Sequence, residues 1–525
     1  MPLLQAQQIS YQFDSGEMLF SNISCKLSAR RTGLIGRNGC GKSVLASILA
    51  KQRKPSDGNV ILNGSVESFS QLTSTTDLSH LTLLQYLQLD SILGALRQVE
   101  RGHYDDNCLE IIGDKWRLEN ELKLLFAELG LNDGFNKKCD ELSGGQLTRL
   151  KLWKLLHSGV DLLVLDEPSN HLDHEGRQWL AREMAQFNGH ILLISHDRML
   201  LRQVSQIWHL SGLGLRQYGG NFDTFFEQQQ LEKLAIERQL DNVQRHQKKL
   251  KKESQSNREK ADIRAKKGLQ DRRQGSQPKI AMNTMRSMAT ASAANRAKND
   301  HGRRERLEAK YQSLQARQEK LKQQAFTITT THSKITTLVS FTDCVLAHGM
   351  QQPISFVVKT GSKVHVSGRN GSGKSTLLKT LLGRLPVASG EASVNAPLYY
   401  LDQHFSLLNK ELSLLETLSL HCPTVEEHHA RTMLAGIGFR HESVHRLVKQ
   451  LSGGEKMKLA MLVASRQAAN PLLLLDEPDN HLDLDSKTLL ARALKEFNGS
   501  FLLVSHDQDF ISECDINYTI DIKLP

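Results

Sequence analysis

The sequence predicts two α/β domains of the P-loop type joined by a long α-helical hairpin linker. Three observations lead to this prediction: a glycine-rich loop that occurs twice, apolar strands that end in the same polar residues in both halves, and a charged middle segment with apolar residues at helical spacing. A chain of 525 residues is also too long for one core. The expected domains cover residues 1–221 and 334–525, and the expected linker covers residues 222–333.

The glycine-rich loop reads G-x-x-x-x-G-K-S at residues 36–43 and again at 368–375. Its glycines let consecutive backbone N–H groups turn toward one anion, its lysine adds a positive charge for the β- and γ-phosphates, and its serine hydroxyl is a ligand for Mg²⁺. An apolar run precedes each copy and a helical pattern follows it, so a chance glycine-rich turn is excluded. The expected phosphate-binding residues are Gly36, Asn38, Gly39, Gly41, Lys42, Ser43 and Val44, with Gly368, Asn370, Gly371, Gly373, Lys374, Ser375 and Thr376 in the second copy.

Composition limits the classes of protein to which this chain can belong. Charged residues make up 24% and hydrophobic residues 39% of the chain, which is ordinary for a globular protein. The sequence begins with neither a basic start nor an apolar core, and no run approaches the ~18 apolar residues of a membrane span, which favours a cytoplasmic protein. The seven cysteines are scattered and never spaced C-x-x-C, so neither a disulfide frame nor a zinc site is expected.

The register of the internal repeat locates an insertion. Lys42 and Lys374 are 332 residues apart, whereas Ser143 and Ser452 are 309 apart. The first copy therefore contains about 23 extra residues after Gln71. We expect them within residues 88–138.

Acidic residues and a histidine follow the buried strands at matching offsets. The apolar run 162–165 ends in Asp166-Glu167, repeated as Asp476-Glu477. At this end of a parallel strand the aspartate is expected to hold Mg²⁺, and the glutamate to orient or deprotonate an attacking water. The run 191–194 leads to His196, repeated as His506, which is suited to contact the γ-phosphate. The four expected catalytic residues are Glu167, Glu477, His196 and His506.

A further motif, Leu142-Ser143-Gly144-Gly145-Gln146, opens a helix that carries Arg149, Lys151 and Lys154. Serine as N-cap and two glycines would expose N–H groups at a helix N-terminus, so this segment can hold an anion. The alternative is an ordinary helix cap. The second copy consists of Ser452, Gly453, Gly454 and Glu455, and its final glutamate would place a carboxylate near bound triphosphate.

Taken in order, these motifs resemble the ATP-binding cassette ATPases, in which Gln71 and Gln403 match the glutamine loop. The resemblance implies a head-to-tail pair of cassettes, with each ATP between one P-loop and the opposite signature motif, and hydrolysis at both sites. It implies that adenine stacks on Phe13, with Tyr11 as the alternative, and on His348 in the second site. It also implies six Mg²⁺ ligands, which are Ser43, Gln71, Asp166, Ser375, Gln403 and Asp476.

The middle of the chain decides which kind of cassette protein this is. Apolar residues at three-four spacing, first Ile236, Leu240, Val243 and Leu250 and then Leu307, Tyr311, Leu314 and Leu321, predict two long antiparallel helices. Residues 245–322 contain 23 Lys and Arg against 8 Asp and Glu, which indicates a polyanion partner unless the charges are only a solvated helix face. Because few aromatic residues occur there, recognition of the backbone or shape of folded RNA is expected.

Together with the linker, residues 218–226 and the repeated Asn-His-Leu-Asp of 170–173 and 480–483 resemble the ABC-F subfamily. The resemblance implies binding to the ribosome at the tRNA exit site in the ATP-bound form, with the linker directed toward the P-site tRNA and rRNA, and a role in translation or antibiotic protection. It places the extra residues at the position of the family's arm. Two alternatives stay open: a DNA-associated cassette ATPase and the ATPase subunit of a membrane importer.

Overall fold

The structure is a computed structural model that describes most of the chain. The described ranges are 3–70, 81–103, 105–129, 131, 137–170, 172–212, 214–273, 298–299, 301–303, 305–314, 336–349, 351–401, 407–423, 425–439, 441–451, 453–467, 471–480 and 482–522. The chain divides into two compact units, residues 224–323 and all residues on either side of them. Within the described ranges, none of the helices combines the length and the apolar character needed to cross a bilayer.

The first cassette contains a six-stranded sheet in the order β5-β6-β7-β3-β8-β9, parallel except for the β8–β9 pair, and a three-stranded antiparallel sheet β2-β1-β4. Its strands are β1 (Leu4–Gln12), β2 (Met18–Lys26), β3 (Arg31–Gly36), β4 (Asp57–Leu62), β5 (Val66–Phe69), β6 (Leu162–Asp166), β7 (His190–Ile194), β8 (Gln206–Ser211) and β9 (Gly214–Gly219). Its helices are α1 (Lys42–Leu49), α2 (Leu83–Leu87), α3 (Asp90–Glu100), α4 (Asp106–Ile112), α5 (Leu118–Glu128), α6 (Gly144–Leu156), α7 (His174–Gln186) and α8 (Arg198–Leu201).

The second cassette repeats this plan with a five-stranded parallel sheet in the order β14-β15-β16-β12-β17 and a three-stranded antiparallel sheet β11-β10-β13. Its strands are β10 (Thr337–Leu346), β11 (Ile354–Lys359), β12 (Lys363–Gly368), β13 (Val387–Val394), β14 (Leu398–Leu401), β15 (Leu472–Asp476), β16 (Ser500–Val504) and β17 (Tyr518–Ile522). Its helices are α11 (Lys374–Leu381), α12 (Leu414–His421), α13 (Glu427–Gly436), α14 (Gly453–Gln467), α15 (Leu484–Glu496) and α16 (Gln508–Glu513).

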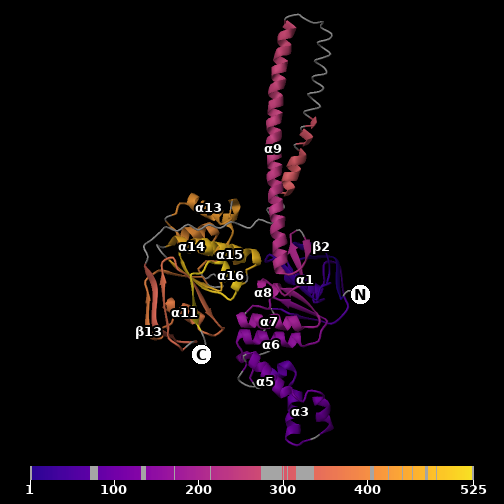
Figure 1. Ribbon diagram of the computed structural model, residues 1–525, viewed down its shortest axis with the longest axis vertical. Helices are drawn as coiled ribbons and strands as arrows, with labels where there is room; N and C mark the ends of the chain where they lie inside the picture. The colour runs from indigo at the N-terminus through magenta and orange to yellow at the C-terminus, as the bar shows by residue number, and fades with distance from the viewer. Residues whose placement is uncertain are drawn as a thin grey trace. The chain divides into compact units, whose positions relative to one another are not determined.

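The central strands are apolar because both of their faces are covered. On β15, Leu472 and Leu474 pack with β10, β11 and α11, whereas Leu473 and Leu475 pack with α12, α14 and α15. The first cassette follows the same rule, with α6 and α7 side by side (Figure 1). Continuous apolar runs are expected for parallel strands buried on both faces. The prediction of two α/β cassettes is therefore confirmed.

The extra residues of the first cassette fold as helices. Helices α3 and α4 pack against each other and bury Leu93, Leu96, Cys108 and Ile112. The thiol of Cys108 donates to Gln98 Oε1 at 3.1 Å. The insertion located by the repeat register is thus a short helical pair.

The linker unit begins with one very long helix. Helix α9 (Phe222–Arg273) has 52 residues, about 78 Å at 1.5 Å per residue. Its predicted apolar stripe packs against the second helical segment, because Ile236, Leu240 and Val243 are buried with Leu314. Gln247 also donates to Glu308 at 3.0 Å. Gly275 and Pro278 would break this helix and begin a tip that contains Met282, Met285 and Met288; these residues, like Leu321, lie outside the described residues.

Candidate active site

Strand order brings the predicted motifs of each cassette together. Strands β6, β7 and β3 are neighbours, and they lead at their carboxyl ends to Glu167, His196 and the P-loop, respectively. Strands β15, β16 and β12 do the same for Glu477, His506 and the second P-loop. The carboxyl edge of a parallel sheet is where α/β proteins bind ligands. Motifs more than a hundred residues apart thus share one edge in each cassette.

Each P-loop depends on glycine at defined positions. Gly39 and Gly41 have φ values of 81° and 94°, in the left-handed region that other residues avoid. A Cβ on Gly36 would lie 2.3 Å from the carbonyl oxygen of Leu210. The Lys42 ammonium donates to the carbonyl oxygens of Gly36 at 2.8 Å and Arg37 at 3.0 Å, so the loop itself fixes the position of this charge.

The second P-loop repeats this geometry. Gly371 and Gly373 have φ values of 81° and 107°, and a Cβ on Gly368 would lie 2.4 Å from Ser372 Oγ. Lys374 Nζ donates to the carbonyl oxygens of Gly368 at 2.7 Å and Arg369 at 2.9 Å. In both cassettes the loop lysine begins the following helix.

The oxygen donors expected for Mg²⁺ lie together in the first cassette. Burial raises the pKa of the Asp166 carboxyl group, and the hydrogen bond that the Ser43 hydroxyl donates to Asp166 opposes this rise. In the second cassette Asp476 accepts a hydrogen bond of 2.8 Å from the Tyr400 hydroxyl. Hydroxyl and carboxylate oxygens are hard donors of the kind that Mg²⁺ prefers, so Ser43 and Asp166 fit the ion. The remaining expected ligands Gln71 and Gln403 lie outside the described residues.

The two glutamates that follow these aspartates share an unusual backbone geometry. Glu167 and Glu477 both have a φ of 48°, and their N–H groups donate to Ile194 at 2.8 Å and Val504 at 2.9 Å. Burial raises the pKa of Glu167 to about 7 and also raises the pKa of Glu477. The strained turn therefore directs each carboxyl group inward, where its environment favours proton uptake.

A histidine stands beside each glutamate. His196 Nε2 lies 3.5 Å from Glu167 Oε1, and His506 Nε2 lies 3.9 Å from Glu477 Oε1. Burial lowers the pKa of His196 and, with the nearby Lys374, lowers the pKa of His506 to about 3. Both imidazoles are therefore neutral near pH 7, where each can donate one hydrogen bond and accept another.

The first signature motif forms the helix start that its sequence predicts. Ser143 is the N-cap of α6, its hydroxyl accepts from Gln146 N at 3.3 Å, and Gln146 Oε1 accepts from Ser143 N at 3.1 Å. This capping box leaves the N–H groups of Gly144 and Gly145 in the first turn of the helix. In the second motif α14 begins at Gly453, whereas Ser452 lies outside the described residues.

The second signature motif has a compensating charge. Arg446 NH1 lies 3.2 Å from Glu455 Oε1, so a guanidinium partly neutralises the carboxylate that stands where the first motif has Gln146. Nothing in the spacing of the motif pointed to Arg446.

We expect Arg446→Ala to raise the KM for ATP several-fold, because Glu455 would then repel the triphosphate without compensation. Steady-state kinetics check this, with Arg446→Ala combined with Glu455→Gln as the matched control. If the KM of the combined variant does not return toward that of the original protein, Arg446 does not act by neutralising Glu455.

The two cassettes contact each other through the aspartates that cap α7 and α15. Asp173 Oδ1 accepts from Gly176 N at 2.9 Å and from Arg149 NH2 at 2.8 Å, while its Oδ2 accepts from the P-loop residue Asn370 at 3.3 Å. Asp483 likewise caps α15 through Ser486 N at 2.8 Å and accepts from Asn38 N at 3.0 Å. Each aspartate thus links a helix start in one cassette to the P-loop of the other.

Arginines of the P-loops add two further contacts across this interface. Arg369 pairs with Glu175 of α7, and Arg37 Nε lies 3.6 Å from Asp485 of α15. Sequence motifs identified the P-loops and the signature helices but not these cross-cassette partners.

The side chains expected to stack on adenine differ in character between the two cassettes. The Phe13 ring packs edge-on against Tyr11 with centroids 5.6 Å apart and is 38% exposed. In the second cassette, an added Cβ on Gly373 would lie 3.0 Å from the carbonyl oxygen of His348, and the His348 side chain is exposed. Both side chains are therefore accessible to solvent.

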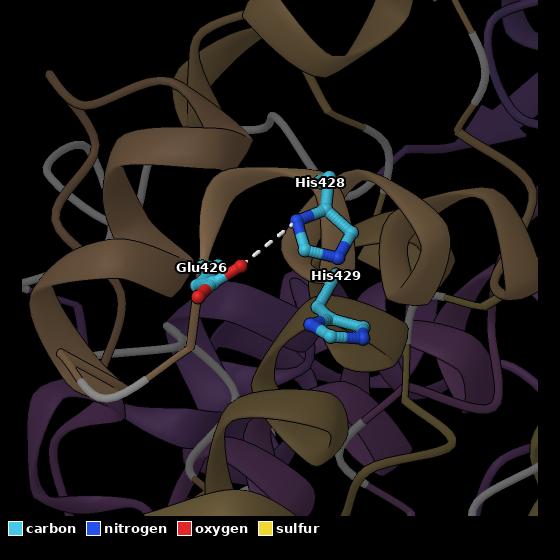
Figure 2. A group of neighbouring side chains, drawn as sticks. All are labelled: Glu426, His428 and His429. Carbon is cyan, nitrogen blue, oxygen red and sulfur yellow. Dashed lines mark ion pairs between the residues drawn. The ribbon is translucent and has the colours of Figure 1, made fainter.

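A separate group of ligand-type side chains lies at the start of α13. Figure 2 shows Glu426, His428 and His429, with His428 Nδ1 3.2 Å from Glu426 Oε2. All three are exposed, and they belong to a helix N-terminus, whose dipole disfavours a bound cation. We assign no metal site to this group.

Known proteins resemble this chain in sequence and in fold. A family model described as ABC transporter matches residues 20–170 and 351–480. The ATP-binding protein YdiF of Bacillus subtilis (strain 168) is 31% identical over 98% of this chain and 79% of its own length. The ATP-binding protein Uup of Escherichia coli (strain K12) is 30% identical over 92% of this chain and 74% of its own length.

Among solved structures, a similar fold occurs in the complex of archaeal ribosomal stalk protein aP1 and archaeal ribosome recycling factor aABCE1. The match has a TM-score of 0.56 at 17% identity and covers 97% of this chain and 86% of that chain.

Proposed function

Because this chain belongs to the ABC transporter family, as a tandem-cassette protein of the ABC-F type, we propose that it hydrolyses ATP to control binding to the ribosome. In this proposal the ATP-bound form binds in the tRNA exit site and acts on translation through the linker. Hydrolysis then releases the protein. The observation that carries the proposal is the pairing of two complete sets of P-loop, acidic and histidine residues with a strongly basic helical linker.

The hydrolysis step is supported by the placement of each glutamate beside a neutral histidine, within the electrostatic influence of the P-loop lysine of the same cassette. Lys42 or Lys374 would neutralise the phosphates, and Ser43 and Asp166 would hold Mg²⁺, which supplies charge neutralisation when bound. Glu167 or Glu477 would orient or deprotonate the water, and His196 or His506 would contact the γ-phosphate.

Coupling to the linker is supported by Arg198, the first residue of α8, and Arg202, the residue that follows α8. Arg202 Nε donates to Asp223 in the first turn of α9 at 3.1 Å, and its terminal nitrogens donate to Asp509 of α16 at 2.8 and 2.9 Å. Arg198 pairs with Glu513 of α16. Helix α8 begins two residues after His196, so one short segment carries contacts both to the second cassette and to the first turn of α9.

The ribosome as partner is supported by the charge of the linker. Residues 245–322 carry 23 Lys and Arg against 8 Asp and Glu, although the whole chain has a net charge of only +10. Such a concentration of one sign suits a phosphate backbone.

The decisive experiment is co-sedimentation of the Glu167→Gln, Glu477→Gln protein with ribosomes after loading with ATP at low salt. We expect ATP-dependent binding and slower translation in a cell-free reaction, and weaker binding with ADP. Stronger binding to duplex DNA than to ribosomes, or association with membranes instead, would overturn the ribosome assignment.

Neutralising the linker should weaken this binding. Lys248, Lys249, Lys251 and Lys252 are exposed on α9, and all four can be changed to glutamine together. The slope of ribosome affinity against salt concentration should then fall by roughly 0.7–0.9 units for each phosphate that the linker no longer neutralises.

The matched control replaces four exposed lysines of the second cassette with glutamine and so removes the same total charge. These lysines are Lys359, Lys379, Lys410 and Lys495. If both quadruple variants lose affinity equally, the linker is not the binding element.

A further inference from the structure

Two buried cations lie at the cassette interface and have no role in the proposed chemistry. Arg177 of α7 and Lys487 of α15 are 8% and 6% exposed, and both follow the capping aspartate of their helix by four residues. They are 310 residues apart, the same offset as Asp166 and Asp476. The internal repeat has thus placed a cation at the same point of both cassettes.

Each cation is held by an aspartate of its own cassette. Arg177 NH1 lies 3.1 Å from Asp197 Oδ2, and Lys487 Nζ lies 2.8 Å from Asp507 Oδ2. These aspartates directly follow His196 and His506 and cap α8 and α16. The cations are therefore fixed in position, because moving either partner would leave a buried charge unpaired.

The two cations also face residues of the opposite cassette. Lys487 lines a cavity of about 220 Å³ together with Glu167 and His196 of the first cassette. Burial raises the pKa of Glu167, and two cations oppose that rise, Lys42 from the same cassette and Lys487 from the other. The same two cations add to the effect of burial in lowering the pKa of His196. Arg177 lines this cavity too, together with Asp479 and Asn480 of the second cassette, and Asn480 Nδ2 donates a hydrogen bond to Glu477 Oε2.

The arrangement is reciprocal at the second site. Burial raises the pKa of Glu477, and Lys374 from the same cassette and Arg177 from the first oppose that rise. The same two cations add to the effect of burial in lowering the pKa of His506. Each glutamate and histidine therefore faces one cation that is always present and one that is present only when the cassettes are paired.

We propose that Arg177 and Lys487 are positioning residues that act across the interface, each placing a fixed positive charge beside the hydrolysis centre of the opposite cassette. Lys487 would attract the Glu167 carboxylate and hold it toward the attacking water, and Arg177 would do the same for Glu477. A preorganised charge in a buried site costs no reorganisation during reaction, so its effect falls on kcat. The inference rests on the proposed function, because it assigns these two glutamates to hydrolysis.

The test uses two single-site enzymes. Glu477→Gln leaves hydrolysis to the first site, and Glu167→Gln leaves it to the second. Into each we introduce Lys487→Met with Asp507→Asn, which removes the ion pair without leaving Asp507 as an unpaired charge, since asparagine can still cap α16. Arg177→Met with Asp197→Asn is the matched change in the first cassette.

The Lys487 pair variant is expected to lower kcat about tenfold in the enzyme with only the first site, with KM for ATP within about twofold. A smaller loss is expected in the enzyme with only the second site, and the Arg177 pair variant should give the opposite pattern. Lys487→Arg should retain kcat within about threefold, because it keeps the charge.

Equal losses at both sites, or a larger loss in the cassette that carries the change, would overturn the inference and leave these ion pairs only a structural role. Absence of hydrolysis in both single-site parents would instead overturn the proposed function.

Discussion

Replacing Glu167 and Glu477 together with glutamine is expected to reduce steady-state ATP turnover by about 10²-fold or more while ATP binding is retained. The reason is that both carboxyl groups are turned inward by a left-handed backbone, whereas phosphate binding depends on the separate P-loops. Phosphate release measures the turnover, and equilibrium binding of a fluorescent ATP analogue measures the affinity.

Glu426→Gln with Glu442→Gln is the matched control for this experiment, because both side chains are exposed and lie outside the site. It should leave turnover unchanged. Turnover within about twofold of the original protein in the Glu167 and Glu477 variant would show that neither glutamate serves hydrolysis.

Ser143→Arg is expected to reduce hydrolysis at the opposite site, built on Lys374, by a similar factor of about 10². The substitution removes the cap of α6 and places a long cationic side chain where the first turn should face the γ-phosphate. The Glu167→Gln enzyme, in which only the second site is active, gives the readout.

The control for this change is Ser158→Arg, which places the same side chain on an exposed serine just beyond the other end of α6. It should leave the second site active. If Ser143→Arg instead slows the site built on Lys42 and spares the other, the head-to-tail pairing is wrong.

Local patterns were sufficient to predict the fold class and much of the site. Each P-loop is one contiguous segment whose glycines, lysine and serine form an anion-binding turn without help from distant residues. The apolar runs that end at Asp166 and Asp476 required burial on both faces, which is met only inside an α/β sheet. The stripe of Ile236, Leu240 and Val243 likewise predicted a helical seam, because its spacing repeats every turn.

The contacts that join the two cassettes could not be predicted in this way. Asn38 and Asp483 are 445 residues apart, and no periodicity or motif spacing carries information over that distance. Arg446 gave no signal either, because an arginine becomes a partner of Glu455 only after the loop before α14 has folded back onto the helix.

The sequence by itself therefore determined two nucleotide-binding cassettes, their order along the chain and a basic helical linker, since each depends on residues close together in sequence. Only the tertiary structure decided which charges face each other across the cassettes. Arg177 and Lys487 are ordinary helix residues in the sequence, and they become interface cations because the capped starts of α7 and α15 point toward the opposite P-loops. Coulomb interactions depend on distance in space and on burial, and both are set by the packing of the folded chain.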